Sequence, residues 1–210
     1  MSLGRGMRTL AIECATEACS VALFDDGELL AGDHRVLGRG HAEHLVPMIA
    51  GLPQRGKAER ILVSLGPGSF TGVRIGIAVA GSLAIAWQAE VAGYPTLSLI
   101  AAMGAESCVG ESLTVCMAGG HGEWFVQDFA GEGRPLSPLF SLTPEAASAR
   151  GAARRIVGTR ASELASMIGA QGGAEFLLPD ARKTCLLDAA NMASTLSPIY
   201  GREPDARLPA

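Results

Sequence analysis

The residues best suited to chemistry lie in one glycine-rich stretch, which reads Ser-Leu-Gly-Pro-Gly-Ser-Phe-Thr-Gly-Val-Arg-Ile-Gly from Ser64 to Gly76. An apolar run precedes the stretch and a helical pattern follows it, so unpaired N–H groups at the helix start could hold an anion. It is not a P-loop, because it lacks Gly-Lys-Ser/Thr, and Thr71 stands where Gly-x-Gly-x-x-Gly needs its third glycine. The candidate anion-binding loop is therefore Gly66, Pro67, Gly68 and Ser69, and a purely structural turn is the alternative.

Acidic and histidine side chains allow two further chemical interpretations. Glu13 and Asp25 could act as catalytic acids, and the alternative is that they are vestigial. His41 and His44 are three residues apart on a predicted helix and could bind zinc with a third ligand. A polar surface or interface pair is the alternative there. No Ser-His-Asp or metal-ligand constellation is legible, so we expect no catalytic and no metal-binding residue.

Composition and charge narrow the class of protein. Acidic residues outnumber basic ones by 21 to 17, giving a net charge of −4. A protein that binds nucleic acid by itself usually carries a basic face, so we expect no strong direct binding to nucleic acid. The five cysteines form no Cys-x-x-Cys pair, which is typical of reduced thiols in a cytosolic protein. The longest apolar run, Ile75 to Trp87, is too short to span a bilayer. We therefore expect a cytoplasmic protein without a membrane segment.

The elements around the glycine-rich stretch follow an α/β pattern. Strands are expected at 9–15, 20–24, 28–36 and 61–65. Asp25-Asp26-Gly27 predicts a hairpin turn between the second and third strands. Apolar residues at helical spacing predict a helix up to Leu52, in which Pro47 should bend the helix or delay its start. Helices are also expected from the glycine-rich stretch to about Trp87 and over 97–105.

The second half of the chain has a weaker pattern. Strands are expected at 113–117, 123–129, 139–142 and 156–158, and helices at 143–150, 161–168 and 188–196. No internal repeat is visible, and the tail from Gly201 is expected to be extended. The order β-β-β-α-β-α predicts a mixed sheet flanked by helices. The following segment of about 85 residues is expected to be too short for both a nucleotide pocket and a sheet.

The long helix also carries a row of small residues. Gly72, Gly76, Ala80 and Ala84 recur every four residues and form a smooth groove along one helix face. Such a groove lets another element approach closely. The row therefore predicts either close packing inside the chain or a helix–helix interface with another chain.

Four segments together resemble one family. The glycine-rich stretch is similar to the signature of the TsaB (YeaZ) family, and so is the opening run from Ala11 to Leu23. The segment His41 to Ile49 resembles the family pattern H-x-E-x-L-x-P-x-I, and Pro198 to Pro204 resembles P-x-Y-x-R. The resemblance is strong over 9–105, weak over 106–187, and returns in the last residues.

The resemblance implies a fold and a role. The fold would be α/β, a two-lobed actin-like ATPase (RNase H-like) fold with a reduced second lobe. The first lobe would comprise 7–105 plus about 188–210, and the second 106–187. The role would be a non-catalytic partner required with TsaD and TsaE for threonylcarbamoylation of the adenosine 3′ to the anticodon in ANN-decoding tRNAs. ATP and metal would be held by the partner subunits and no cofactor by this chain alone.

The family's dimer surface is built by its first two helices, which correspond here to about 41–52 and 70–87. The expected partner interface therefore includes His41, Glu43, Leu45, Met48, Ile49, Phe70, Thr71, Gly72, Arg74, Gly76, Ala80 and Ala84. In isolation the same surface should form a homodimer.

This chain departs from the family pattern at two places. Glu13 stands where the family usually has Asp, and the Asp-Ala-Arg motif of the second lobe is missing from Met117 to Glu123. Three alternatives to the partner subunit are a glycoprotease-like peptidase, a small ATPase and a homodimeric binding module.

Overall fold

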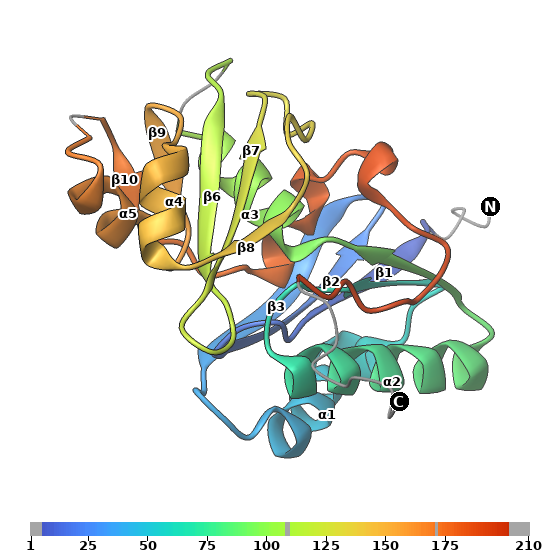
Figure 1. Cartoon of the computed structure of the whole chain (residues 1–210). Helices are drawn as coiled ribbons and strands as arrows, with labels where there is room; N and C mark the ends of the chain where they lie inside the picture. Colours follow the sequence, from blue (N-terminus) through green and yellow to red (C-terminus); the bar gives the residue numbers. More distant parts are fainter. Residues whose placement is uncertain (1–5, 108–109, 171, 202–210) are drawn as a thin grey trace.

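The computed structural model describes residues 6–107, 110–170 and 172–201, which build two five-stranded sheets (Figure 1). The first sheet has the spatial order β3-β2-β1-β4-β5, from β1 (Arg8–Glu13), β2 (Ala18–Asp25), β3 (Glu28–Val36), β4 (Arg60–Ser64) and β5 (Glu90–Tyr94). The second has the order β10-β9-β6-β7-β8, from β6 (Leu113–Ala118), β7 (Trp124–Phe129), β8 (Phe140–Leu142), β9 (Arg155–Val157) and β10 (Ala174–Glu175). The end of the family-like C-terminal motif and the predicted extended tail after Gly201 lie outside the described residues.

Both sheets have the same topology. In the first, β1, β2 and β3 pair antiparallel, while β4 and β5 run parallel to β1. In the second, β6, β7 and β8 pair antiparallel, while β9 and β10 run parallel to β6. The chain thus contains one architecture twice, although its sequence shows no repeat. The second segment does build a sheet, because β8, β9 and β10 need only two or three residues each. The expectation that it is too short to hold a nucleotide pocket as well stays a prediction.

The predicted hairpin turn between β2 and β3 is confirmed. β2 ends at Asp25 and β3 begins at Glu28, and the two residues between them have positive φ, 48° at Asp26 and 83° at Gly27. This is the two-residue turn that Asp-Gly favours, because its twist matches that of the strands.

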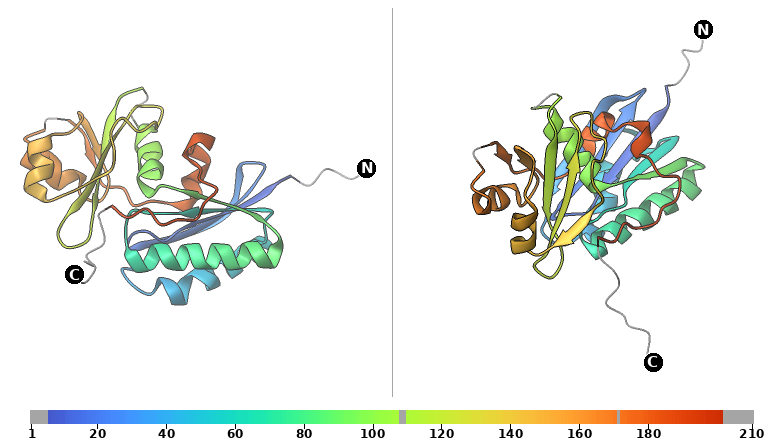
Figure 2. Two further views of the ribbon diagram at one scale, coloured as in Figure 1. Left: turned by 45° about the vertical axis from the view of Figure 1, so that its right-hand side comes forward. Right: turned by 45° about the horizontal axis from the view of Figure 1, so that its top comes forward.

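Two helices cover one face of the first sheet. α1 (His41–Gly51) and α2 (Phe70–Trp87) lie side by side beneath it, and the short 3-10 helix η1 (Pro53–Gly56) follows α1 (Figure 2). Pro47 lies inside α1 and does not delay its start, contrary to one expectation. Pro47 and Glu43, whose carbonyl loses its helical partner, are both exposed, so water can satisfy that carbonyl.

The opposite face of the first sheet meets α3 (Thr96–Ala105) and the C-terminal segment. Leu99 packs with Leu62 and Tyr94 of the first sheet, whereas Leu97 and Ile100 belong to the core of the second sheet. α3 therefore joins the two sheets through two of its faces. The far face of the second sheet is covered by α4 (Pro144–Arg150) and α5 (Ala161–Met167).

The predicted helix at 188–196 is wrong. The segment contains the 3-10 helices η2 (Ala181–Leu186) and η3 (Ala189–Asn191), after which Ala193 pairs antiparallel with Gly93 at the edge of β5. The two backbone hydrogen bonds of this pairing, both 2.8 Å long, hold the chain extended. A tertiary contact therefore overrides local helix preference. The domain limits remain a prediction, and η2 already packs against β1, β2 and β3.

Candidate functional site

The glycine-rich stretch is a tight connection between the end of β4 and the start of α2. The Gly66–Pro67 peptide is cis, and Gly66 has φ 86°, a left-handed conformation that favours glycine. Ser69 caps α2, since its Oγ accepts a hydrogen bond from the N–H of Gly72 over 3.2 Å. One of the N–H groups that an anion would need is therefore already satisfied.

The connection also packs directly on the backbone that follows β1. The N–H of Ser69 donates to the carbonyl oxygen of Ala15 over 2.7 Å. A Cβ on Gly68 would meet that oxygen, and a Cβ on Gly72 the carbonyl oxygen of Cys14, each well inside the 3.0 Å that Cβ atoms keep. Close backbone approach thus explains both glycines and supports the structural-turn alternative. Anion binding by Gly66 to Ser69 stays a prediction.

Glu13 lies fully buried at the carboxyl end of β1, beside this connection. Its Oε1 accepts a hydrogen bond from the N–H of Ala15 over 2.7 Å, while Oε2 has no partner among the described residues. Burial raises the pKa of Glu13 to about 7, although the hydrogen bond from the N–H of Ala15 opposes the shift. The carboxyl group therefore caps the backbone that directly follows its own strand.

Glu13 and Asp25 cannot act as a catalytic pair. Asp25 is aligned with Arg8 at the start of β1, whereas Glu13 is aligned with Ser20 at its end. Five residues of strand separate these positions by roughly 17 Å. A shared reaction would need the two carboxyl groups much closer, since paired glycosidase carboxylates lie within about 10 Å.

The histidines of α1 differ in their surroundings. His41 is buried and its Nε2 lies 3.2 Å from the carbonyl oxygen of Ala18, while His44 is exposed. Within residues 6–107, 110–170 and 172–201, no three His, Cys, Asp or Glu side chains gather as they would around a metal ion. The two histidines therefore have no third ligand nearby in the described chain.

An aromatic and arginine cluster lies on the surface beside the glycine-rich connection. Phe70 is 64% exposed and Tyr200 is 52% exposed. The Arg74 guanidinium lies between them, with its Cζ 3.2 Å from the centre of the Phe70 ring and its Nη2 donating to the Tyr200 hydroxyl over 2.8 Å. This cation–π contact and hydrogen bond hold all three side chains in place.

The cluster continues along the outer face of α2, which we define as Phe70, Arg74, Ala78 and Ile85. Ile85 is 84% exposed, an unusual position for a large apolar side chain. At 100° per residue these positions point away from the small-residue row. α2 is long and apolar enough to cross a membrane by length and composition, a weak criterion that core helices also meet, and 22% of it is buried. It is longer than the apolar run predicted from the sequence.

Comparison with known proteins decides the family. A family model described as "TsaD: tRNA N6-adenosine threonylcarbamoyltransferase" matches residues 35–139, which is half of the chain. Over 100 residues the chain is 43% identical to the Escherichia coli K12 protein named tRNA threonylcarbamoyladenosine biosynthesis protein TsaB, and over 105 residues it is 30% identical to the Bacillus subtilis protein of that name. The crystal structure of an uncharacterized Pseudomonas aeruginosa protein with similarity to peptidase YEAZ has 28% identity and a TM-score of 0.77, covering 93% of this chain and all of that one.

The chain belongs to the TsaB (YeaZ) family. The matched regions make up 45% of this chain and 43% of the E. coli relative, and 47% and 45% for the B. subtilis relative, so they span less than half of either curated protein. A second structure, YeaZ from P. aeruginosa, covers 84% of this chain with a TM-score of 0.70. The predicted two-lobed actin-like (RNase H-like) fold with a reduced second lobe is confirmed.

Within this TsaB family member, the small-residue row faces inward. Gly72, Gly76 and Ala80 are buried, and a Cβ on Gly76 would touch Val63 of β4 at 3.5 Å and Cys14, which follows β1, at 3.6 Å. Ala84 is half-buried against the same core. These four residues were assigned to a partner interface, but they pack inside the chain, because the chain's own sheet occupies the groove.

The same correction applies to α1. Leu45, Met48 and Ile49 are part of the core beneath the first sheet, and His41 is buried beside Ala18. Of the predicted interface residues, the exposed ones are Glu43, Phe70, Thr71 and Arg74. Whether these four touch a partner stays a prediction.

Two exposed residues of the outer surface were missed by sequence reasoning. Ile85 lies opposite the small-residue row on the helical wheel, and this position could have shown from the sequence that it is exposed. Tyr200 lies 126 residues from Arg74 in the chain, and only its place in the C-terminal motif marked it.

The region of the missing Asp-Ala-Arg motif is the hairpin between β6 and β7. His121 is exposed there with φ 58°, next to Gly122 with φ 81°. Glu123 accepts a hydrogen bond from Ser141 over 2.6 Å. This hairpin therefore uses Glu123 to tie β7 to β8.

Proposed function

We propose that this chain is a TsaB-type partner subunit in the formation of N6-threonylcarbamoyladenosine in tRNA. It acts with TsaD-like and TsaE-like proteins in the cytoplasm and does not itself perform the transfer. The names of its curated relatives support its involvement in threonylcarbamoyladenosine biosynthesis. The observation that supports the partner role is the exposed apolar outer face of α2, which continues into the aromatic and arginine cluster.

The chemistry of that face is suited to a protein partner. Protein–protein hot spots are enriched in aromatic residues and arginine. Covering large exposed apolar side chains with a partner lowers the free energy of the complex. Phe70 and Ile85 lie on one side of one helix, with Val46 exposed on the neighbouring α1. A partner helix laid along α2 could cover all three. In isolation, a second copy of this chain would cover them instead.

Catalysis is assigned to the partners because the chain's own candidate groups serve the fold. Glu13 is buried against Ala15, and the glycine-rich connection is packed on the backbone that follows β1. We therefore expect this chain alone to bind neither ATP nor metal, both of which the partner subunits would hold. Direct tRNA binding should be weak, given the net charge of −4.

The test is size-exclusion chromatography with light scattering on the chain alone and mixed with the TsaD protein of the same organism. The variants are Ile85→Glu, Phe70→Ala and, as a matched control, Leu136→Glu, which changes a 51% exposed leucine in the second sheet's region. We expect a heterodimer that replaces a homodimer, loss of both by Ile85→Glu, at least about tenfold weaker association for Phe70→Ala, and no effect of Leu136→Glu.

Normal association of Ile85→Glu would exclude the outer face of α2 as the docking surface. Failure of the unmodified chain to associate with TsaD at micromolar concentration would remove the partner role. Nucleotide hydrolysis by the isolated chain would then be measured, since a small ATPase is the alternative.

A further inference from the structure

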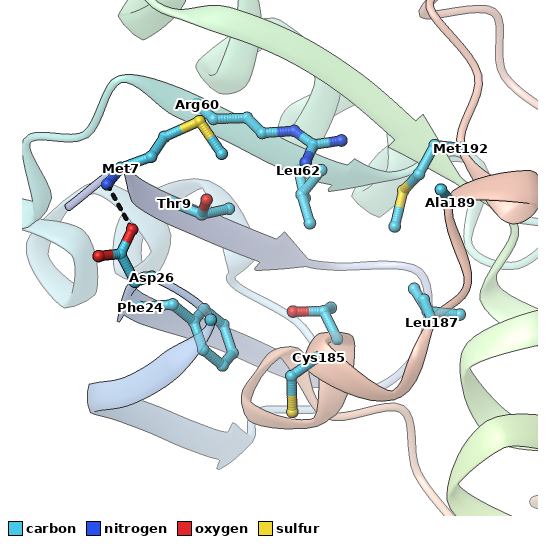
Figure 3. A pocket seen from close by; sticks show the side chains of 12 residues that line it. Met7, Thr9, Phe24, Asp26, Arg60, Leu62, Cys185, Leu187, Ala189 and Met192 are labelled. Carbon is cyan, nitrogen blue, oxygen red and sulfur yellow. Dashed lines mark hydrogen bonds between the residues drawn. The ribbon is translucent and has the colours of Figure 1, made fainter.

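A hollow of about 410 Å³ opens on the face of the first sheet opposite α1 and α2 (Figure 3). Its floor is made by Thr9, Phe24 and Leu62, which come from three adjacent strands. The C-terminal 3-10 segment forms one wall with Cys185, Leu187 and Met192. The hollow lies at the amino ends of β1 and β4, whereas Glu13 and the glycine-rich connection lie at their carboxyl ends.

One cation that borders this hollow has no side-chain partner in the described part of the chain. Figure 3 shows the Arg60 side chain extended along the rim with its guanidinium above Leu62. Arg60 is half-buried, and its side chain makes no hydrogen bond and no ion pair with any other described residue. The other described half-buried arginines all pair with a carboxylate or amide oxygen: Arg8, Arg150, Arg155 and Arg160. Its guanidinium nitrogens are not among the buried polar atoms that lack a partner, so they are open to water or to a ligand that enters the hollow.

The rest of the lining limits what that ligand can be. Phe24 and Leu62 are buried apolar side chains, so the floor favours a hydrocarbon tail. The nearby Asp26 carboxylate is directed to the N–H of Met7, with Oδ1 accepting over 2.9 Å. Asp26 thus adds a negative charge at the rim, which opposes any anion and opposes a doubly charged one about twice as strongly as a singly charged one.

We propose that this hollow binds a small amphipathic monoanion, a carboxylate with a short aliphatic tail. Arg60 pairs with the carboxylate, and the tail lies on Phe24 and Leu62 between Met7 and Met192. The site is independent of the proposed tRNA-modifying role, because α1 and α2 lie on the other face of the sheet.

The test uses the full chain with ¹³C-labelled methionine methyl groups. Met7 and Met192 line the hollow, while Met48 and Met117 are buried elsewhere and serve as references. Hexanoate, hexan-1-ol and hexylamine are titrated in turn. We expect hexanoate to shift the Met7 and Met192 signals saturably in the range of about 1 mM, and the uncharged alcohol to bind at least about tenfold more weakly.

Arg60→Gln removes the charge and should weaken hexanoate binding about tenfold, whereas Arg60→Lys should retain most of it. Arg55→Gln is the matched control, since Arg55 is exposed on η1 outside the hollow. Unchanged Met48 and Met117 signals establish that each variant is folded. The proposal is overturned if hexanoate gives no saturable shift up to about 20 mM, or if alcohol, amine and carboxylate bind alike and Arg60→Gln has no effect.

Discussion

Replacing Gly72 by alanine tests whether the small-residue row serves the fold. A Cβ at this position would lie well inside 3.0 Å of the carbonyl oxygen of Cys14, a backbone atom, and no side-chain rotation can move a Cβ out of the way. The first turn of α2 must therefore move away from the first sheet by most of an ångström. Overpacking of this kind costs about 1–3 kcal/mol. A clash that only a backbone shift can relieve belongs at the upper end of that range.

The same substitution also gains helix propensity, which opposes the clash. Alanine is preferred to glycine in a helix interior by about 1 kcal/mol. The net expectation for Gly72→Ala is a loss of about 2 kcal/mol in the free energy of unfolding, or a fall of about 4–8 °C in Tm for a chain of this size. The helix supplies a matched control, since a Cβ on Gly81 would meet nothing within 4 Å.

The assay is urea unfolding followed by circular dichroism, with thermal melts as a second measurement. Gly81→Ala should raise the free energy of unfolding by up to about 1 kcal/mol, because it gains propensity without a clash. The two variants must therefore move stability in opposite directions. A Gly72→Ala protein as stable as the unmodified chain would refute the conclusion that backbone contact fixes glycine at this position.

Three further predictions concern Glu13, Ser69 and the cysteines. Burial raises the pKa of Glu13 from 4.5 to about 7, so between these pH values the folded state binds a proton that the unfolded state has lost. The free energy of unfolding should therefore fall by up to roughly 3 kcal/mol as the pH rises from 4.5 to beyond 7. Glu13→Gln should abolish this loss in unfolding titrations at several pH values. Ser69→Ala removes the cap on the N–H of Gly72 and should cost about 1 kcal/mol by urea unfolding, and a neutral result would contradict the capping role. The exposed Cys185 should react quickly with an alkylating reagent, whereas Cys116 should react only after unfolding because burial raises its pKa to about 12; mass spectrometry of the labelled peptides would distinguish them.

Local signals in the sequence were enough for the elements around the site. Asp26-Gly27 predicted the two-residue turn because these residue types accept positive φ. Helical spacing from Leu45 to Leu52 predicted α1, and the family-like motifs predicted the two-lobed fold. All of these depend on residues close together in the chain, or on a pattern shared with relatives.

Other features depended on contacts between distant segments. The helix predicted at 188–196 did not form because Ala193 pairs with Gly93, a hundred residues away. In the second sheet, β6 to β9 lie where strands were expected, whereas β10 was missed because a strand of two residues shows no periodicity.

The orientation of α2 on the first sheet shows most clearly what a sequence pattern leaves undecided. The sequence determined that α2 has a groove of small residues and an opposite face with Phe70 and Ile85, because helical geometry alone fixes which residues share a face. Only the tertiary structure decided that the groove meets the first sheet. There the carbonyl oxygen of Cys14 lies so close to Gly72 that a Cβ would clash with it. Likewise, no local pattern could show that the Arg60 side chain has no acceptor among the described residues, because that depends on what β1, β2 and the C-terminal segment bring beside it.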